Sequence, residues 1–143
     1  CAYSYFEEID SVANKDFVAR FKARMGDGAP ALNELAARSY EAAFIWAEAV
    51  KAAGTADRMP VIEALRSGIA YDGPSGRVDI EPKTNHLNQN VYLAELKDQS
   101  FNIVESYQSQ PPTDTLMVCD LVANPDQSVF KFENGLKAAG IDI

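Results

Sequence analysis

The residues best able to do chemistry gather around a turn, Gly73-Pro74-Ser75-Gly76, and the single histidine that follows it, His86. A serine between glycines is typical of a hydrolase nucleophile elbow, but that motif needs a helix after the turn, and here a strand-like segment follows. A phosphate-binding loop would need a lysine and a helix, which this stretch also lacks. His86 has no second histidine, and no cysteine or carboxylate stands at metal-ligand spacing around it. We therefore interpret Ser75 as a turn residue and His86 as structural, and we predict no catalytic and no metal-binding residues.

Neighbouring carboxylates and scattered aromatic rings are the remaining candidates. Glu7 and Glu8 offer acid–base groups, but adjacent carboxylates where a strand ends are usually solvated. Aromatic rings line many pockets, because pockets are mostly apolar, and the rings considered are Tyr3, Tyr5, Tyr40 and Trp46. We interpret Trp46, beside alanines in mid-helix, as core, whereas core and pocket stay equal alternatives for Tyr5. Because no nucleophile–base pair is evident, we expect no enzymatic activity and no cofactor.

Length, charge and cysteine content narrow the function classes. The 143 residues suit one domain, and 47% hydrophobic with 24% charged residues is ordinary for a folded globule. Twenty-one acidic against 13 basic residues give a formal charge of −8, so we expect no nucleic-acid partner. The apolar runs are too short for a membrane span, and we expect any export signal to lie upstream or to have been removed. Cys1 and Cys119 are able to pair in an oxidising compartment, but they give neither a disulfide framework nor metal spacing.

Apolar periodicity predicts a strand over 1–6 and then three helices. The first helix starts at a Ser11 cap and ends at Gly26, with an apolar face made of Phe17, Val18, Phe21 and Met25. The second is an alanine-rich helix over 32–53 that ends at Gly54, with residues at helical spacing that are Leu35, Ser39, Tyr40, Ala43, Trp46, Ala47 and Val50. The third lies near 60–66, capped by Thr55 or Asp57 and stopped by Gly68, and its inward residues are Val61, Ala64 and Leu65.

After the third helix, the spacing of apolar residues changes from the helical period to the alternation that is typical of strands. Alternating residues predict strands around 78–80, 91–96 and 101–107, and the link Lys97-Asp98-Gln99-Ser100 indicates a hairpin between the last two. After Pro111-Pro112 we expect a short strand over 116–119 and a last helix over 128–139.

Three stretches together resemble one family: YSYFEEIDSVANKDFVARFKARMG (3–26), ELAARSYEAAFIWAEAVKAAGT (34–55) and YDGPSGRVDIEPKTNHLNQNVYLAEL (71–96), followed by FNIV (101–104). They resemble the type I periplasmic solute-binding proteins of ABC transporters. Within that family the sequence is similar to the urea, short-chain amide and branched-chain amino acid branch, which includes the amide receptor that regulates aliphatic amidase. The resemblance covers residues 3 to about 110, and it looks like the C-terminal third of the family, so we expect a missing N-terminal segment of the same protein.

The resemblance implies an α/β fold of two Rossmann-like lobes joined by three hinge crossings that close over a ligand. Residues 1–75 would supply the second crossing and three helices of the first lobe. Residues 76–143 would supply the third crossing, strands of the second lobe and a C-terminal tail. The turn before the third crossing would need glycine and proline for its dihedral angles, and Asn85-His86 would cap the approach to an edge strand.

The resemblance also implies a ligand site at the end of the first strand, around Ser4 and Tyr5, and at the start of the long helix, around Glu34 and Leu35. The implied function is a periplasmic binding protein that captures a small amide, urea or an amino acid and delivers it to the permease subunits of an ABC transporter. An amide-sensing cytoplasmic regulator of the same fold, which binds and releases a partner protein, is the alternative.

Overall fold

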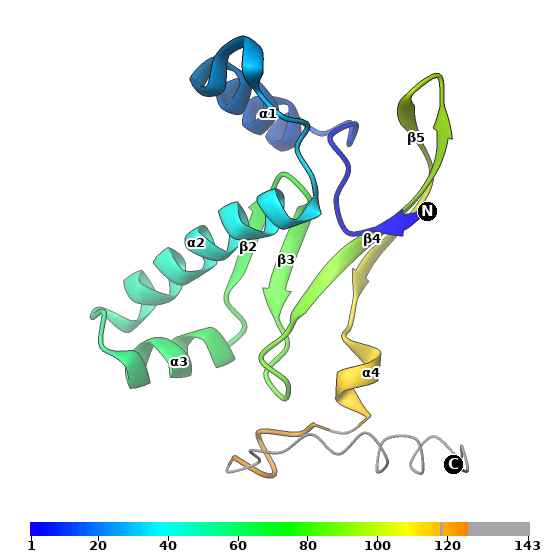
Figure 1. The fold of residues 1–143 in the computed structure, drawn as a ribbon. Coiled ribbons are helices and arrows are strands. Elements are labelled where there is room, and N and C mark those ends of the chain that lie inside the picture. Colours follow the sequence, from blue (N-terminus) through cyan, green and yellow to red (C-terminus); the bar gives the residue numbers. More distant parts are fainter. Residues whose placement is uncertain (118, 126–143) are drawn as a thin grey trace.

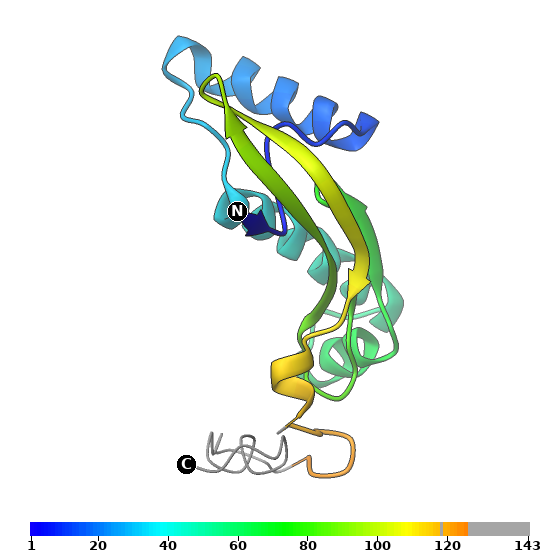
Figure 2. The ribbon, with the colours of Figure 1, turned by 90° about the vertical axis from the view of Figure 1, so that its right-hand side faces the viewer.

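The computed structural model describes residues 1–117 and 119–125. The helices between residues 12 and 66 lie along one side of a curved sheet (Figures 1 and 2), which agrees with the α/β class. The elements in chain order are β1 (Ala2–Tyr3), α1 (Val12–Met25), a 3-10 turn (Gly26–Gly28), α2 (Glu34–Ala53), α3 (Arg58–Arg66), β2 (Ala70–Gly73), β3 (Gly76–Ile80), β4 (Leu87–Lys97), β5 (Ser100–Gln110) and α4 (Thr113–Leu116).

The three predicted helices are confirmed, and the starts of α1 and α2 follow capping rules, whereas α3 starts after Asp57 without a side-chain cap and ends at Ser67 rather than at the predicted Gly68. The Ser11 side chain accepts from the Asn14 N–H at the start of α1, and the Asn33 side chain does the same for the Ala36 N–H at the start of α2. Gly54 ends α2 in a left-handed conformation with φ of 68°, as predicted. Because Asn33 is the cap, α2 begins two residues later than the predicted start at residue 32.

The predicted inner face of α2 is wrong. The buried positions are spaced by four residues and are Ala37, Glu41, Ile45 and Ala49. Trp46 is 54% exposed and Leu35 is 75% exposed, so neither belongs to the core of the described residues. The apolar pattern misled because a carboxylate, Glu41, stands at the centre of the buried face, where hydrogen-bond partners compensate its burial. Met25 on α1 is likewise exposed rather than inward.

The sheet is built around β4, which pairs with β1 and β3 along one edge and with β5 along the other. All strand pairs among the described residues are antiparallel. The hairpin predicted at 97–100 is confirmed, and its two central residues, Asp98 and Gln99, both have positive φ. The approach formed by Asn85 and His86 therefore leads into a central strand, not into the predicted edge strand.

Three predictions about strands need correction. The first strand is confined to Ala2–Tyr3, because the chain leaves the sheet before residues 4–6, which pack as a buried loop. The strand β2 was not predicted, since Ala70–Gly73 is too short to show alternation. The strand predicted over 116–119 is wrong at Leu116, which ends α4, and the helix predicted over 128–139 lies outside the described residues.

The glycine turn joins β2 to β3 and confirms the interpretation of Ser75 as a turn residue. Gly76 has φ of 93°, which favours glycine, and a Cβ there would collide with the Asn90 amide. Gly73 is constrained by space instead, since a Cβ would lie 2.5 Å from Glu41 Oε1. Both glycines therefore serve the geometry of the turn.

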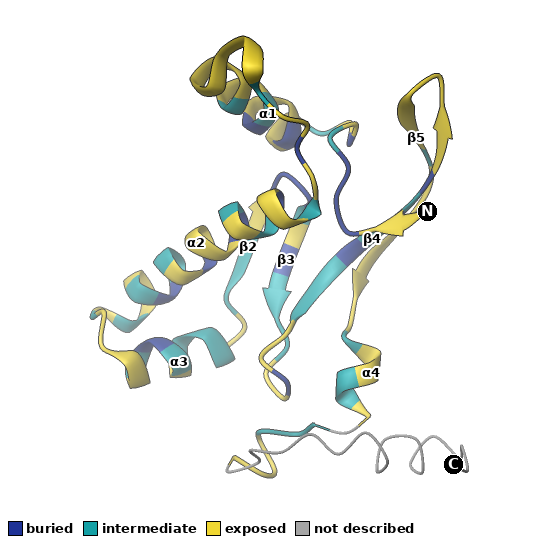
Figure 3. Cartoon of the chain, in the orientation of Figure 1, coloured by how far each residue is buried: buried dark blue, intermediate teal, exposed yellow. Residues whose placement is uncertain are grey.

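One apolar cluster connects the helices to the sheet, and Figure 3 shows the buried residues gathered where α2, the loop after β1 and the middle of β4 meet. Its buried members are Tyr5, Phe6, Ile9, Phe17, Leu32, Ala37, Tyr92 and Ala94. The cluster draws on both sides of the predicted division at residue 75. Four further buried apolar residues, Ile45, Ala49, Val61 and Val78, lie outside this cluster, and the division into two lobes stays a prediction.

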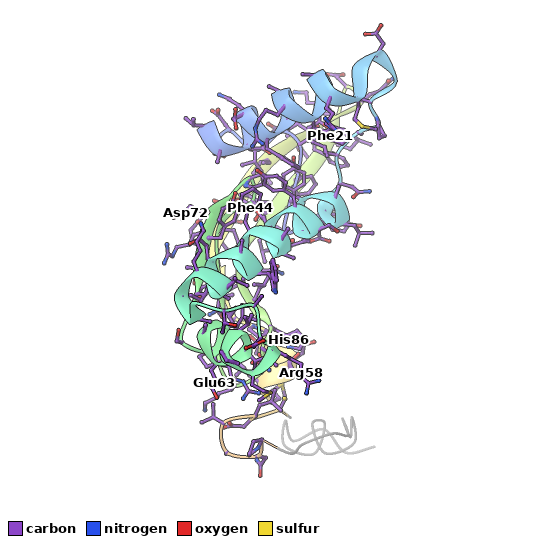
Figure 4. All side chains as sticks on the ribbon, turned by 90° about the vertical axis from the view of Figure 1, so that its left-hand side faces the viewer. Phe21, Phe44, Arg58, Glu63, Asp72 and His86 are labelled. Carbon is purple, nitrogen blue, oxygen red and sulfur yellow. The ribbon has the colours of Figure 1, made fainter. Side chains whose placement is uncertain are left out.

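A row of aromatic rings extends this cluster along α2. Phe17 lies 4.6 Å from Tyr40, Tyr40 lies 4.7 Å from Phe44, and Phe44 stacks on Tyr71 at 5.0 Å, measured between ring centroids. Figure 4 shows Phe44 turned from α2 toward the strand that carries Asp72. Tyr40 is therefore a packing residue that joins α1 and α2 to β2.

Candidate functional site

An open cavity of about 1050 Å³ lies between α1, the loop after β1, the start of α2 and the tip of the β4–β5 hairpin. Its lining is mainly apolar, with a few charged groups, as in most ligand sites. The lining residues are Tyr3, Tyr5, Phe6, Glu7, Glu8, Lys15, Val18, Ala19, Lys22, Ala31, Leu32, Asn33, Glu34, Leu35, Gln99, Ser100 and Phe101.

The structure brings the four predicted site residues together. Tyr5, Glu34 and Leu35 line the cavity, and Ser4 lies buried behind Glu34. The Ser4 N–H donates to Glu34 Oε1 at 2.8 Å, and the Ser4 hydroxyl donates to the same oxygen. Both hydrogen bonds of Glu34 within the described residues thus go to Oε1, which fixes the carboxylate beside the cavity. The role of these residues in ligand binding stays a prediction.

The lysines of the cavity are already paired with carboxylates. Lys22 Nζ lies 2.5 Å from Glu7 Oε1, and Lys15 Nζ lies 2.5 Å from Asp10 Oδ1. Burial alone would raise the pKa of Glu7, but hydrogen bonds from Lys22 and from the Leu32 N–H, together with the lysine charge, lower that pKa below its ordinary value. Glu7 is therefore a bridge between α1 and the loop before α2, rather than the solvated surface carboxylate that was predicted.

Glu8 holds the other wall of the cavity. Its Oε1 accepts from the Ser100 hydroxyl at 3.0 Å and from the Phe101 N–H at 3.1 Å, so it fastens the hairpin tip to the loop after β1. Phe101 in turn packs on Phe6 with 5.0 Å between ring centroids. No local pattern in the sequence indicates that a hairpin tip some 90 residues away reaches this loop.

Tyr5 is held in place rather than free to react. Its hydroxyl donates to Asn14 Oδ1 at 2.9 Å, and the Asn14 amide donates to the carbonyls of Glu7 and Ile9. Burial raises the pKa of the Tyr5 phenol, and nearby carboxylates, Glu7 first among them, raise it further. A neutral phenol in this position contributes an aromatic surface and no acid–base chemistry near neutral pH.

Within residues 1–117 and 119–125, no group of three histidine, cysteine or acidic side chains is placed to hold a metal ion. His86 lies beside α3, far from α1 (Figure 4), and its Nδ1 lies 3.1 Å from the Thr84 carbonyl, as a structural residue would. Cys1 and Cys119 are both free thiols. In the part of the chain that the structure describes, no helix is long and apolar enough to cross a bilayer.

Comparison with known proteins identifies a family. The model of the periplasmic binding protein family matches residues 1–100. A Leu/Ile/Val-binding protein homolog of Brucella abortus is 31% identical over 95 residues, which are 66% of this chain and 24% of that protein. A protein named limonene hydroxylase from Geobacillus stearothermophilus is 28% identical over 127 residues, which are 87% of this chain and 23% of that protein.

Solved structures agree with the family. An ABC-transporter solute-binding protein of Rhodopseudomonas palustris, crystallised with p-hydroxybenzoic acid, matches with a TM-score of 0.67 and 29% identity over 77% of this chain and 31% of its own. The chain thus spans about a quarter to a third of the length of these relatives. With the family model covering residues 1–100, this chain belongs to the periplasmic binding protein family.

Proposed function

We propose that the protein is an extracytoplasmic solute-binding protein that captures a small amide, urea or a branched-chain amino acid and delivers it to the permease of an ABC transporter. The observation that carries the proposal is the Glu34 carboxylate, fixed by Ser4 at the edge of a largely apolar cavity. A fixed carboxylate accepts hydrogen bonds from amide N–H groups or from an ammonium group. Family membership supports the transport role and the location.

The charge of the cavity supports a ligand that presents N–H donors. Three carboxylates and two lysines line it, and both lysines are engaged by carboxylates of the protein. A ligand that carries a carboxylate but no ammonium group would therefore meet net negative charge and would have to displace an existing ion pair. The relative with p-hydroxybenzoic acid shows that the fold also accommodates aromatic acids, so carboxylic acids without an ammonium group are the competing class for this chain.

The shape of the cavity supports lobe closure. About 1050 Å³ is more space than urea or a short-chain amide fills, and the cavity is open to solvent. We propose that residues 1–75 belong to one lobe and that residues 76–143 lead into another, and that closure narrows the site around the solute. Leu32, Leu35 and Val18 would then offer an aliphatic wall to the apolar part of the ligand.

A calorimetric panel tests the proposal. Acetamide, urea, leucine and 4-hydroxybenzoate are titrated into the protein in its full natural length, and its thermal stability is recorded with each. A bound ligand at 100 times its Kd raises the free energy of unfolding by about 2.7 kcal/mol. We expect this stabilisation with at least one of the three N–H donors, whereas stabilisation by 4-hydroxybenzoate alone would contradict the proposed ligand class.

The substitution Glu34→Gln tests whether Glu34 belongs to the binding site. The substitution removes the charge, and we expect it to weaken binding of the N–H donor about tenfold, the loss of one charge-assisted hydrogen bond. Glu63→Gln is the matched control, since Glu63 is an exposed residue of α3 remote from the cavity (Figure 4). Equal affinities in the two variants would remove Glu34 from the binding site.

A further inference from the structure

A continuous chain of buried and partly buried polar contacts connects the cavity to the glycine turn. Glu34 is bonded to Ser4, Ser4 to Arg38, Arg38 to Glu41, and Glu41 to Ser75. Ser4, Glu41 and Ser75 are each at most 3% exposed. The contacts thus run through the core of the described residues, from the mouth of the cavity to the junction of β2 and β3.

The directions of these hydrogen bonds leave little freedom. The Ser4 hydroxyl gives its single proton to Glu34 and accepts from Arg38 Nε at 3.0 Å, while Arg38 Nη2 donates to the Ser4 carbonyl at 3.2 Å. At the other end the Ser75 hydroxyl donates to Glu41 Oε1 at 2.7 Å and accepts from Arg38 Nη1 at 3.0 Å. Both serines are therefore oriented by the same guanidinium.

Glu41 anchors the guanidinium. Its Oε2 accepts from Arg38 Nη1 at 2.7 Å, and its Oε1 accepts from the N–H and the hydroxyl of Ser75. A carboxylate buried this completely is stable only with such partners. Gly73 contributes independently, because only the absence of a Cβ lets the Glu41 carboxylate approach the turn. The planar fork of arginine matches four acceptor contacts that a lysine ammonium would not reach together.

We propose that Arg38, anchored by Glu41 on the glycine turn, is a positioning residue that sets the orientation of Ser4 and, through it, of the Glu34 carboxylate that receives the ligand. The ligand named in this inference rests on the proposed function, whereas the orientation of Ser4 and Glu34 by Arg38 does not. The affinity of the cavity for an N–H donor thereby depends on the turn at residues 73–76, which lies at the predicted boundary between the two parts of the chain.

Two measurements on the full natural-length protein test the proposal. The first is NMR hydrogen exchange of the Ser4 amide, which donates to Glu34, compared with the Val61 amide, which donates to Asp57 in α3. In Arg38→Met we expect protection of Ser4 to fall at least tenfold while protection of Val61 stays within twofold. A general loss of stability would lower the protection of both amides from exchange. Equal loss of protection at both sites would therefore overturn the proposal.

The second measurement is calorimetric affinity for acetamide in Arg38→Met, Arg38→Lys and the control Lys51→Met, whose lysine pairs with Glu48 on the exposed face of α2. We expect both Arg38 variants to lose about tenfold in affinity and the control to lose none. Full rescue by Arg38→Lys would show that charge alone suffices and would overturn the proposed orientation. If wild-type protein binds none of acetamide, urea and leucine, the proposed ligand class fails, while the exchange of Ser4 still decides the positioning role.

Discussion

Gly73→Ala probes the contact between the glycine turn and α2 with a single methyl group. The new Cβ would lie 2.5 Å from Glu41 Oε1 and 2.8 Å from a ring carbon of Tyr71. Glu41 is fully buried, so the carboxylate can move away only by giving up its bonds to Ser75. Hydrogen bonds to a charged group contribute about 1.5–3 kcal/mol each, and the lower entropy of an unfolded alanine chain offsets about 0.4–1 kcal/mol.

The expected net loss in the free energy of unfolding is about 2–5 kcal/mol. Urea unfolding of the full natural-length protein, followed by circular dichroism, measures it. Gly28→Ala is the matched control, because no atom lies within 4 Å of its added Cβ and its φ is not left-handed. We expect the control to change by less than about 1 kcal/mol. Equal stability of the two variants would refute the close approach of Glu41 to the turn.

Further predictions concern acid stability and packing. Because the pKa of Glu7 is lowered from 4.5, its contribution to stability is complete above about pH 4.5 and is lost as pH falls through the folded-state pKa. The stability difference between wild type and Glu7→Gln, measured by urea unfolding, should therefore shrink below that pH, and a constant difference would contradict the ion pair. Phe17→Ala should cost about 3–5 kcal/mol, because its ring is 7% exposed between Tyr5 and Tyr40. Trp46→Ala should cost less than about 1 kcal/mol, because Trp46 is half exposed, and a larger cost in thermal or urea unfolding would place this ring in the core.

Local signals predicted the elements well. Ser11, Gly54 and the link at 97–100 indicate helix and hairpin boundaries because capping and turn geometry depend on a few neighbouring residues. Such local signals could not predict which face of α2 is buried. Glu41 is buried because Arg38 and Ser75 meet it, and Ser75 lies 34 residues further along the chain. The spacing of apolar residues cannot predict the burial of a charged residue whose hydrogen-bond partners come from elsewhere in the chain.

The candidate site was predictable in part. The resemblance to binding proteins led to Ser4, Tyr5, Glu34 and Leu35, and the structure places all four within one local region. The hairpin wall around Phe101 was not predictable, because it depends on Glu8 reaching the hairpin tip across most of the chain. Contacts between residues so far apart in the sequence follow from the tertiary fold and leave no pattern in neighbouring residues.

A crystal structure of the full natural-length protein with its bound solute would show whether Glu34 receives the ligand. We expect the solute in the cavity between α1 and the start of α2, with a ligand nitrogen within hydrogen-bond distance of the Glu34 carboxylate. A solute bound elsewhere, with Glu34 facing only water, would contradict it.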